Sequence, residues 1–425
     1  MAIKKKSKLA ILGGEKMVSD DCIKPWPKIT DLDRKYVLKA LEGPSYTYGP
    51  NCTQFEKDFA KWNGNKHSIL TNSGTAALHM SIAACGCGSG DQVIVPAYSW
   101  TSSVTCLLHH NTLPVFVDID YDTMNIDPSK IEAAITPKTK AIMVVHLHGL
   151  AADMEAIRKI AKKHKLKIIE DACQSHGASI KNKNVGLWGD CTGFSLNHNK
   201  SLTSGEGGVF VTNDEQILEK AKMLWSFGET RKPNESRDYH AYALGWMYRS
   251  CELVAAFGRA QLTKLDRNLK IQKENAETFI EGVKDIPGLI IPFVPKGYNH
   301  TYYNVTLRID AKKLGFEGRD VAIRNAILKA LRAEGTQCGI WQRYILPAMT
   351  VFQAKNAYGH GCPWNCPNSL PVDYNPENYP VAQKHCDTHF GMTMPFRAPN
   401  TKKTAKLIAS AFHKVFDNIK DLQVD

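Results

Sequence analysis

Short β-branched segments alternate with longer helical segments from about residue 66, and this alternation constrains the fold more than any other feature. Strands that alternate with helices need crossover connections, which produce a mostly parallel sheet with helices on both faces. Continuous apolar runs such as Ile142–Val145 indicate strands that are buried on both sides. The predicted strands are His67–Thr71, Gln92–Val95, Leu113–Val117, Thr139–Leu147 and Lys167–Glu170, and the predicted helices between them are Gly74–Cys85, Thr101–His109 and Met154–His164.

The pattern changes after Asp171, and this change suggests a second domain. Two further strands, Thr192–Leu196 and Val209–Thr212, are separated by Gly-rich turns, and a long helical region covers Val254–Glu281. Past Pro287 the pattern predicts a strand, a helix, a Pro- and Asn-rich loop and a final helix over Lys403–Ile419. A chain of 425 residues suffices for two domains. We predict a large α/β domain over residues 1–275 and a smaller α+β domain over residues 276–425.

The charge of the chain is basic but dispersed. Lys and Arg number 54 against 42 Asp and Glu, and only Lys4–Lys6 forms a run. A nucleic-acid-binding protein would show a clustered basic stripe, so we expect no nucleic-acid partner. We expect the positive charge to attract an anionic cofactor or substrate instead. No apolar run approaches the ~20 residues of a membrane span, and no signal peptide is evident. We therefore expect a cytoplasmic protein without membrane contact.

The cysteines do not indicate a disulfide framework. There are twelve, and without an export signal we expect them to be reduced. The densest group is His360, Cys362 and Cys366. A structural zinc site usually needs a second close pair of ligands, so we expect no metal and read this segment as a Pro-rich loop with buried thiols. Zinc remains the alternative.

Two of the predicted strands end in segments that suit a bound anion or cation. Thr71–Leu78 passes from strand to helix through small residues, so the backbone N–H groups of Gly74 and Thr75 could hold a phosphate. A simple helix N-cap is the alternative. Ile168–Gln174 ends in two carboxylates, and a buried carboxylate is costly unless it meets a cation. The alternative there is a cap or a structural salt bridge.

A third segment contains one lysine between two turns of small residues. Lys200 follows the predicted strand Thr192–Leu196. Used as a nucleophile, such a lysine must lie in a partly desolvated pocket; an ordinary surface lysine is the alternative. A phosphate anchor, a carboxylate and a lysine at neighbouring strand ends are together the parts that a pyridoxal phosphate (PLP) site requires.

Three motifs carry a resemblance to a known family. Ser73–Leu78, Glu170–Gln174 and Lys200-x-Leu-x-x-Gly-Glu-Gly-Gly resemble the DegT/StrS group of sugar aminotransferases, from about Pro25 to Asp266. The resemblance implies a PLP-dependent enzyme of fold type I, with a large domain of mostly parallel, mixed sheet flanked by helices and a smaller C-terminal α+β domain.

The resemblance also implies roles for individual residues. Lys200 would form the Schiff base with the cofactor and shuttle the proton. Asp171 would pair with the ring nitrogen, and Gln174 would contact the phenolic oxygen. Trp100 would stack on the ring, although it could instead be a buried core aromatic. The phosphate would be held by Gly74, Thr75, Ala76 and Ser195.

The implied reaction moves an amino group from glutamate or glutamine to a ketone on a sugar or cyclitol, in amino-sugar, surface-glycan or antibiotic biosynthesis. Two departures from the family pattern matter. Met247 stands where an asparagine usually reaches the partner's phosphate in the homodimer, although the surrounding match still implies a dimer. The segment Trp341–Met349 lacks the substrate histidine that many nucleotide-sugar members carry. In this respect the chain is similar to the branch of the family that acts on free cyclitols, deoxy-inosose or aminohydroxybenzoate-type rings.

Two other functions stay open. A PLP-dependent deoxysugar dehydratase of this group would replace the lysine by histidine, whereas here the nearest histidine is His198. A PLP-binding regulatory protein is the other alternative, and Met247 is the feature that suggests it.

Overall fold

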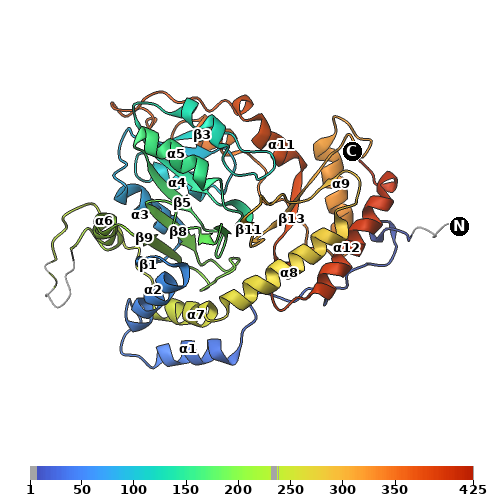
Figure 1. The fold of residues 1–425 in the computed structure, drawn as a ribbon, viewed down its shortest axis with the longest axis horizontal. Helices are drawn as coiled ribbons and strands as arrows, with labels where there is room; N and C mark the ends of the chain where they lie inside the picture. Colours follow the sequence, from blue (N-terminus) through green and yellow to red (C-terminus); the bar gives the residue numbers. More distant parts are fainter. Residues whose placement is uncertain (1–6, 231–236, 238, 425) are drawn as a thin grey trace.

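The computed structural model describes residues 7–230, 237 and 239–424; the Lys4–Lys6 run lies outside them. A seven-stranded sheet in the order β1-β9-β8-β5-β4-β2-β3 forms the centre of the larger unit (Figure 1). Strand β9 runs antiparallel to both of its neighbours, and the other strand pairs are parallel. The prediction of a mostly parallel, mixed sheet is therefore confirmed. The strands are β1 His67–Thr71, β2 Gln92–Pro96, β3 Leu113–Val117, β4 Thr139–Val145, β5 Lys167–Asp171, β8 Cys191–Ser195 and β9 Gly208–Thr212.

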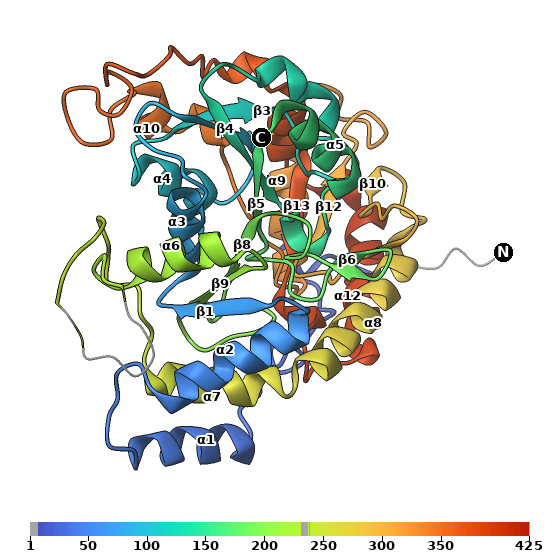
Figure 2. The ribbon, with the colours of Figure 1, turned by 60° about the vertical axis from the view of Figure 1, so that its left-hand side comes forward.

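Helices cover both faces of this sheet (Figure 2). Helices α3 (Gly74–Ala84), α4 (Ser102–Leu108) and α6 (Glu215–Trp225) share one apolar core with one face. Helices α2 (Pro50–Asn63), α5 (Met154–His164) and α7 (Glu252–Leu262) share a second core with the other face. Burial on both sides explains why every residue of β2 is buried and why its sequence is apolar from Val93 to Pro96.

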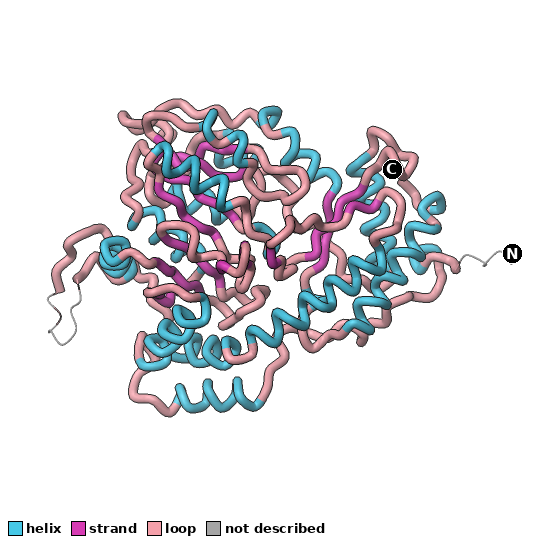
Figure 3. The backbone as a smooth tube through the Cα atoms, in the orientation of Figure 1, coloured by secondary structure: helices cyan, strands magenta, loops and turns pink. Residues whose placement is uncertain are grey.

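A second unit is built around a small antiparallel sheet, which lies apart from the large one (Figure 3). Strands β10 (Leu289–Ile290), β12 (Val305–Ile309) and β13 (His389–Met392) pack in one core with α8 (Leu265–Val283), α9 (Asp320–Ala333) and α12 (Lys402–Asp417). Leu9 and Val18 from the N-terminal segment join this core, whereas Ile345 and Phe352 belong to the core of the large sheet. The boundary placed at residue 275 lies within α8 and stays a prediction.

The remaining elements are short. Among the described residues, no helix is both long and apolar enough to span a membrane. The other helices are α1 Asp31–Leu41, α10 Thr350–Gln353 and α11 Pro380–Thr388; a third sheet contains β6 Ser179–Ile180, β7 Lys183–Asn184 and β11 Tyr298–Asn299; and 3-10 turns lie at Ala10–Leu12, Pro128–Lys130, Glu132–Ala134, Leu147–Gly149, Leu346–Ala348, Pro376–Asn378, Met394–Phe396 and Ile419–Asp421.

The helical region predicted over Val254–Glu281 is interrupted. Helix α7 ends at Leu262 and α8 begins at Leu265. At the break, the Thr263 hydroxyl donates to the carbonyl of Ala260, and the Lys264 ammonium pairs with the buried Asp33 carboxylate at 2.7 Å. Side chains that bond to nearby backbone compete with helical hydrogen bonds, and the periodicity of apolar residues does not show this competition.

Glu56 in α2 gives the fold a testable pH dependence. Its carboxylate accepts hydrogen bonds from the Leu70 N–H and the Tyr48 hydroxyl, each at 2.7 Å, and burial raises its pKa from the ordinary 4.5 to about 7. A carboxyl with a raised pKa binds its proton more tightly in the folded state. Its stabilising contribution is therefore complete below pH 4.5 and is lost as the pH rises through about 7.

We expect Glu56→Gln to gain stability relative to the wild type between pH 5 and pH 8, by about 2 kcal/mol, since the amide does not titrate. Thermal melting of both proteins at the two pH values measures this difference. A difference in melting temperature that does not change with pH would contradict the assignment.

Candidate active site

The three predicted motifs meet in one cavity of about 300 Å³ at the carboxyl ends of the parallel strands. Parallel strands present these ends at one edge of the sheet, where ligands of α/β proteins bind. Strand β1 leads into α3, β5 ends at Asp171, and β8 ends at Ser195 ahead of the Lys200 loop. The cavity is lined by Ser73, Gly74, Thr75, Trp100, Ser102, Asp171, Cys173, Gln174, Ser195, Asn197, Asn199, Lys200, Glu206, Tyr303 and Trp341.

The N-terminus of α3 lines this cavity through Gly74 and Thr75. The Ser73 side chain caps the helix by accepting from the Ala76 N–H at 3.1 Å. The first N–H groups of a helix, here those of Gly74 and Thr75, have no partner within the helix. A Cβ on Gly74 would lie 2.8 Å from the Ser195 Cβ, so glycine lets the two segments approach closely. Ala76 does not line the cavity, and its role in holding phosphate stays a prediction.

Asp171 is held firmly at the end of β5. It is 4% exposed, its Oδ2 accepts from the Ser103 hydroxyl at 2.6 Å, and its Oδ1 accepts from the Cys173 N–H at 3.0 Å. These two donors fix the carboxylate and leave it lining the cavity. No sequence signal pointed to Ser103, because it comes from α4, 68 residues earlier in the chain.

Glu170, the other carboxylate of the motif, is structural. Adjacent strand residues face opposite sides of the sheet, so Glu170 does not line the cavity. Its carboxylate lies 2.8 Å from the His146 Nε2 and accepts from the N–H groups of Gly186, Trp188 and Gly189. Burial alone would raise its pKa, but these partners hold the pKa below its usual value. For Glu170, the structural interpretation of the motif, a salt bridge rather than a ligand contact, is therefore the one that applies.

Lys200 points its amine towards an aromatic hydroxyl. Its Nζ lies 3.3 Å from the Tyr303 hydroxyl and 4.8 Å from the centre of that ring, and it makes no ion pair within the described chain. Its backbone carbonyl accepts from the Trp26 Nε1 at 3.1 Å and from Arg397 at 3.4 Å. Arg397 is fully buried, and its Nε and Nη2 contact no acceptor among the described residues. The lysine is thus anchored through its backbone while its amine stays available.

Gln174 and Trp100 also line the cavity. The Gln174 Oε1 accepts from the His148 N–H at 2.9 Å, which leaves the amide NH₂ as the group able to donate to a ligand. Trp100 is 53% exposed, so it is not a buried core residue, and its ring centre lies 6.1 Å from that of Trp341. Its stacking role stays a prediction.

Two aromatic residues from the C-terminal part of the chain complete the cavity. Tyr303 lies 103 residues beyond Lys200, and no sequence motif marked it. Trp341 begins the segment Trp341–Met349, which the family resemblance had associated with the substrate, and it lines the cavity. The Cys362 and Cys366 sulfurs lie 4.0 Å apart. Within the described ranges, no group of three His, Cys, Asp or Glu side chains is arranged to hold a metal ion.

The residues present fit PLP. The cavity combines helix N–H groups for a phosphate, a carboxylate for a ring nitrogen, an amide donor for a phenolic oxygen and a lysine amine for an aldehyde. No described carboxylate neutralises the partly buried Lys200 or the fully buried Arg397, and a buried cation without a counter-ion favours an anionic ligand nearby.

The comparisons with known proteins agree with this arrangement. The model of the DegT/DnrJ/EryC1/StrS aminotransferase family matches residues 27–368. Spore coat polysaccharide biosynthesis protein SpsC of Bacillus subtilis is 37% identical over 314 residues, which cover 72% of this chain and 79% of that protein. L-Glutamine:2-deoxy-scyllo-inosose aminotransferase of Micromonospora echinospora is 32% identical over 396 residues, 90% of each chain.

A solved structure shows the same fold at full length. The crystal structure of 3-amino-5-hydroxybenzoic acid synthase is 28% identical, with a TM-score of 0.81 over 92% of this chain and 99% of that one. The predicted fold type I architecture is therefore confirmed. The chain belongs to the DegT/DnrJ/EryC1/StrS aminotransferase family and is a PLP-dependent aminotransferase.

Proposed function

We propose that the enzyme holds PLP in the cavity at the strand ends and transfers an amino group from glutamine or glutamate to a ketone on a cyclitol or sugar. The observation that carries this proposal is the convergence of Lys200, Asp171, Gln174 and the α3 N-terminus on one 300 Å³ space. The product class is the amino sugar or aminocyclitol of surface-glycan or aminoglycoside biosynthesis, as the names of the relatives indicate.

Each residue has a distinct task in this proposal. When bound, PLP supplies an aldehyde that takes up the amino group and a ring that accepts electrons from the substrate Cα. Asp171 keeps a proton on the ring nitrogen, because Ser103 and the Cys173 N–H hold its carboxylate in place. The Lys200 Nζ moves the proton at the substrate carbon, and the Tyr303 hydroxyl orients that amine.

The other cavity residues position the cofactor. The Gly74 and Thr75 N–H groups and Ser195 bind the phosphate, with Ala76 as a further candidate, and the Gln174 amide donates to the phenolic oxygen. Trp100 covers one face of the ring and excludes water from it.

A free cyclitol ketone is the substrate class that we favour. Trp341 lines the cavity beside Trp100, and the segment Trp341–Met349 contains no histidine. Two aromatic walls suit a compact ring without a nucleotide. The relative that covers 90% of this chain is named for an inosose substrate and glutamine as donor.

The substrate test compares two ketones with each donor. The purified enzyme is incubated with 2-deoxy-scyllo-inosose or with a nucleotide-linked 4-keto-hexose, in the presence of L-glutamine or L-glutamate. Mass spectrometry then detects the amine product. We expect amination of the inosose; amination of the nucleotide sugar alone would contradict the cyclitol assignment, and loss of water from it would indicate the dehydratase reaction.

We further propose a homodimer that covers an exposed apolar strip. Phe227, Tyr242, Leu244 and Met247 are each at least 40% exposed and lie close together in the chain. Exposed apolar groups gathered in one segment are typical of an interface. Met247 offers no polar side-chain donor to a partner's phosphate, so we expect the N–H groups of α3 to carry that contact. Light scattering of the purified enzyme should give twice the 47.3 kDa chain mass.

We also propose that the enzyme works in the cytoplasm, and cell fractionation would test this.

Replacing Gly74 by alanine should weaken PLP binding by about 10–100-fold, because a Cβ would lie 2.8 Å from the Ser195 Cβ and overpacking costs about 1–3 kcal/mol. Gly88→Ala is the matched control, since a Cβ there meets nothing within 4 Å. Fluorescence titration with PLP measures both. Equal affinity of the two variants would mean that Gly74 does not shape the phosphate site.

Tyr303→Phe should lower kcat by about tenfold while changing the KM for the amino donor little, because the lost hydroxyl orients the Lys200 amine at 3.3 Å. Tyr302→Phe removes a hydroxyl one residue away that makes no hydrogen bond with the described residues, so it should leave kcat unchanged. Steady-state kinetics with saturating ketone give both parameters. An effect on KM alone would assign Tyr303 to donor binding.

A further inference from the structure

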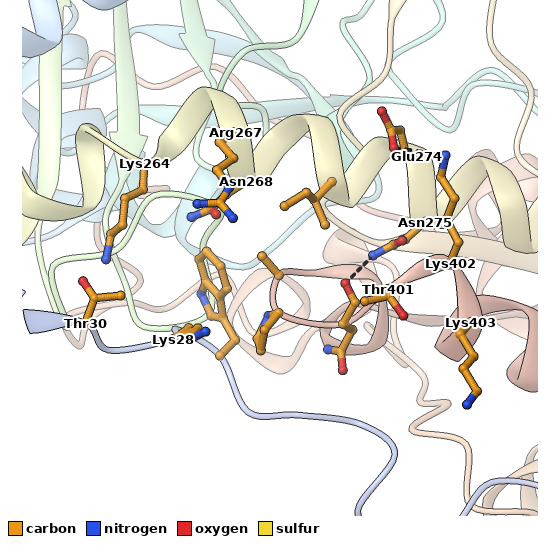
Figure 4. Close-up of a pocket in the computed structure, with 15 residues that line it drawn as sticks. Lys28, Thr30, Lys264, Arg267, Asn268, Glu274, Asn275, Thr401, Lys402 and Lys403 are labelled. Carbon is orange, nitrogen blue, oxygen red and sulfur yellow. Dashed lines mark hydrogen bonds and ion pairs between the residues drawn. The ribbon is translucent and has the colours of Figure 1, made fainter.

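A surface cavity lies between α8 and the start of α12, apart from the active-site cavity (Figure 4). Its volume is about 730 Å³, and its lining includes the exposed cations Lys28, Arg267 and Lys403. Water solvates exposed lysine and arginine side chains, so they need no ligand. This cavity presents charge to the solvent but no built site.

Two thiols lie close together in the loop that follows α10. Cys362 and Cys366 belong to the His360–Cys366 segment, which the proposed function does not involve, and their sulfurs lie 4.0 Å apart. Both side chains are partly exposed. Since the S–S bond of a disulfide is about 2 Å long, the two sulfurs need to approach by about the same amount to form one.

Backbone turns keep the two ends of this segment together. The Asn365 N–H donates to the carbonyl of Gly361 at 2.9 Å, and the Cys366 N–H donates to the carbonyl of Pro363 at 3.2 Å. Neither hydrogen bond uses a cysteine side chain. The distance between the Cys362 and Cys366 sulfurs can therefore shorten through side-chain rotation while the turns stay intact.

A second pair of thiols provides an internal comparison. The Cys85 and Cys191 sulfurs are closer together, at 3.4 Å, but Cys191 is 1% exposed and lies on β8 in the core of the large sheet. An oxidant must reach a thiol before a disulfide forms, so a short distance alone does not make a pair reactive. Exposure therefore favours oxidation of Cys362 and Cys366 over oxidation of the buried pair.

The loop that carries the exposed thiols packs against the large sheet. The Trp364 Nε1, between the two cysteines, donates to the Tyr374 hydroxyl at 3.1 Å, and that hydroxyl donates to the carbonyl of Pro114 in β3 at 2.9 Å. The Tyr358 hydroxyl donates to the carbonyl of Leu108 at the end of α4 at 3.0 Å. A covalent bond across the turn would brace the part of the loop that contacts β3 and α4.

We propose that Cys362 and Cys366 are a reversible thiol–disulfide site, oxidised by a small-molecule disulfide such as oxidised glutathione. One cysteine, as its thiolate, attacks the oxidant and releases one small thiol; the other then attacks the mixed disulfide and releases the second. Two protein thiols and one oxidant disulfide thus give one protein disulfide and two small thiols, which take up the two protons. The proposal does not depend on the roles assigned to Lys200 or Asp171.

The test treats the PLP-loaded, full-length enzyme with oxidised glutathione, alkylates the remaining thiols under denaturing conditions and digests the protein with trypsin. Cleavage after Lys355 and Lys384 gives a peptide of residues 356–384, whose only cysteines are Cys362 and Cys366. Mass spectrometry should find this peptide without alkyl groups and lighter by two hydrogen atoms than the dithiol. Its oxidation should be at least about tenfold faster than that of the buried pair defined above.

Two variants and a melting experiment complete the test. Cys366→Ser removes one partner, so Cys362 should keep glutathione as a mixed disulfide. Cys22→Ser is the matched control, because Cys22 is also partly exposed but lies in the N-terminal segment; its rate of disulfide formation should stay within about twofold of the wild type. The oxidised wild type should melt at a higher temperature than the reduced one, because the bond restricts the unfolded chain, and Cys366→Ser should lose this difference.

Three results would each overturn the proposal. The first is a wild-type 356–384 peptide that stays alkylated at both cysteines after oxidation. The second is a wild-type peptide that keeps glutathione instead of forming the internal disulfide. The third is oxidation of Cys85 and Cys191 at the same rate as Cys362 and Cys366.

Discussion

Replacing Lys200 by alanine should reduce amino transfer by at least about 10⁴-fold, because the variant loses the amine that we propose both to bind the cofactor aldehyde and to move the proton. The visible absorption of the lysine-bound cofactor should disappear as well. PLP itself should remain in the cavity, since the contacts proposed for its phosphate, ring nitrogen and phenolic oxygen do not involve this side chain.

The fold should survive this change. The Lys200 side chain makes one 3.3 Å contact to Tyr303, whereas the contacts that fix its loop use its backbone carbonyl, which accepts from Trp26 and Arg397. Because the side chain makes no ion pair and only this one hydrogen bond, we expect a stability change of about 1 kcal/mol or less. Thermal melting and circular dichroism measure it.

His198→Ala is the matched control for Lys200→Ala. His198 lies in the same loop, is exposed and does not line the cavity. We expect this variant to keep wild-type activity. Transamination retained by Lys200→Ala, or lost in His198→Ala, would contradict the assignment of the catalytic amine; the second result would also revive the dehydratase reading.

Asp171→Asn is the second change with a large expected effect. The amide has nearly the same shape but no charge, so it cannot keep the ring nitrogen protonated. We expect kcat to fall by about 100-fold or more, the range that general acid–base groups contribute. PLP affinity should change far less, because the contacts that we propose for the α3 N-terminus and Lys200 do not involve this carboxylate.

The comparison for this variant is Asp190→Asn. Asp190 lies beyond the other end of β5, where it accepts from the Ile168 N–H at 2.8 Å and pairs with Lys167 at 2.7 Å. It is remote from the cavity lining, so its substitution should change stability more than turnover. A fully active Asp171→Asn enzyme would show that another group protonates the ring.

The sequence predicted those parts of the site that short motifs encode. Strand β1, helix α3 and strand β5 have the predicted order, and their ends bring Gly74, Asp171 and Lys200 together because parallel strands end at one edge of the sheet. The strand-end pattern by itself did not separate Glu170 from Asp171, and the family resemblance assigned the ring nitrogen to Asp171. The alternation of side chains along β5 separates them, and the partners of Glu170, His146 above all, assign it to the structure.

The parts that could not be predicted depend on packing between distant segments. Tyr303 reaches Lys200 from a segment 103 residues away, and Trp26 reaches the same loop from 174 residues away. Neither residue belongs to a pattern that marks it, because aromatic residues occur equally in ordinary cores.

The role of Lys200 in amino transfer can be tested by the visible absorption spectrum of the purified, PLP-loaded enzyme, recorded before and after adding L-glutamine or L-glutamate. We expect a yellow band for the wild type that bleaches with at least one donor, and no such band for Lys200→Ala. Bleaching identifies the donor without knowledge of the ketone. A wild-type enzyme that forms no band, or a band that neither donor changes, would contradict the assignment of Lys200 and its cavity as the site of amino transfer.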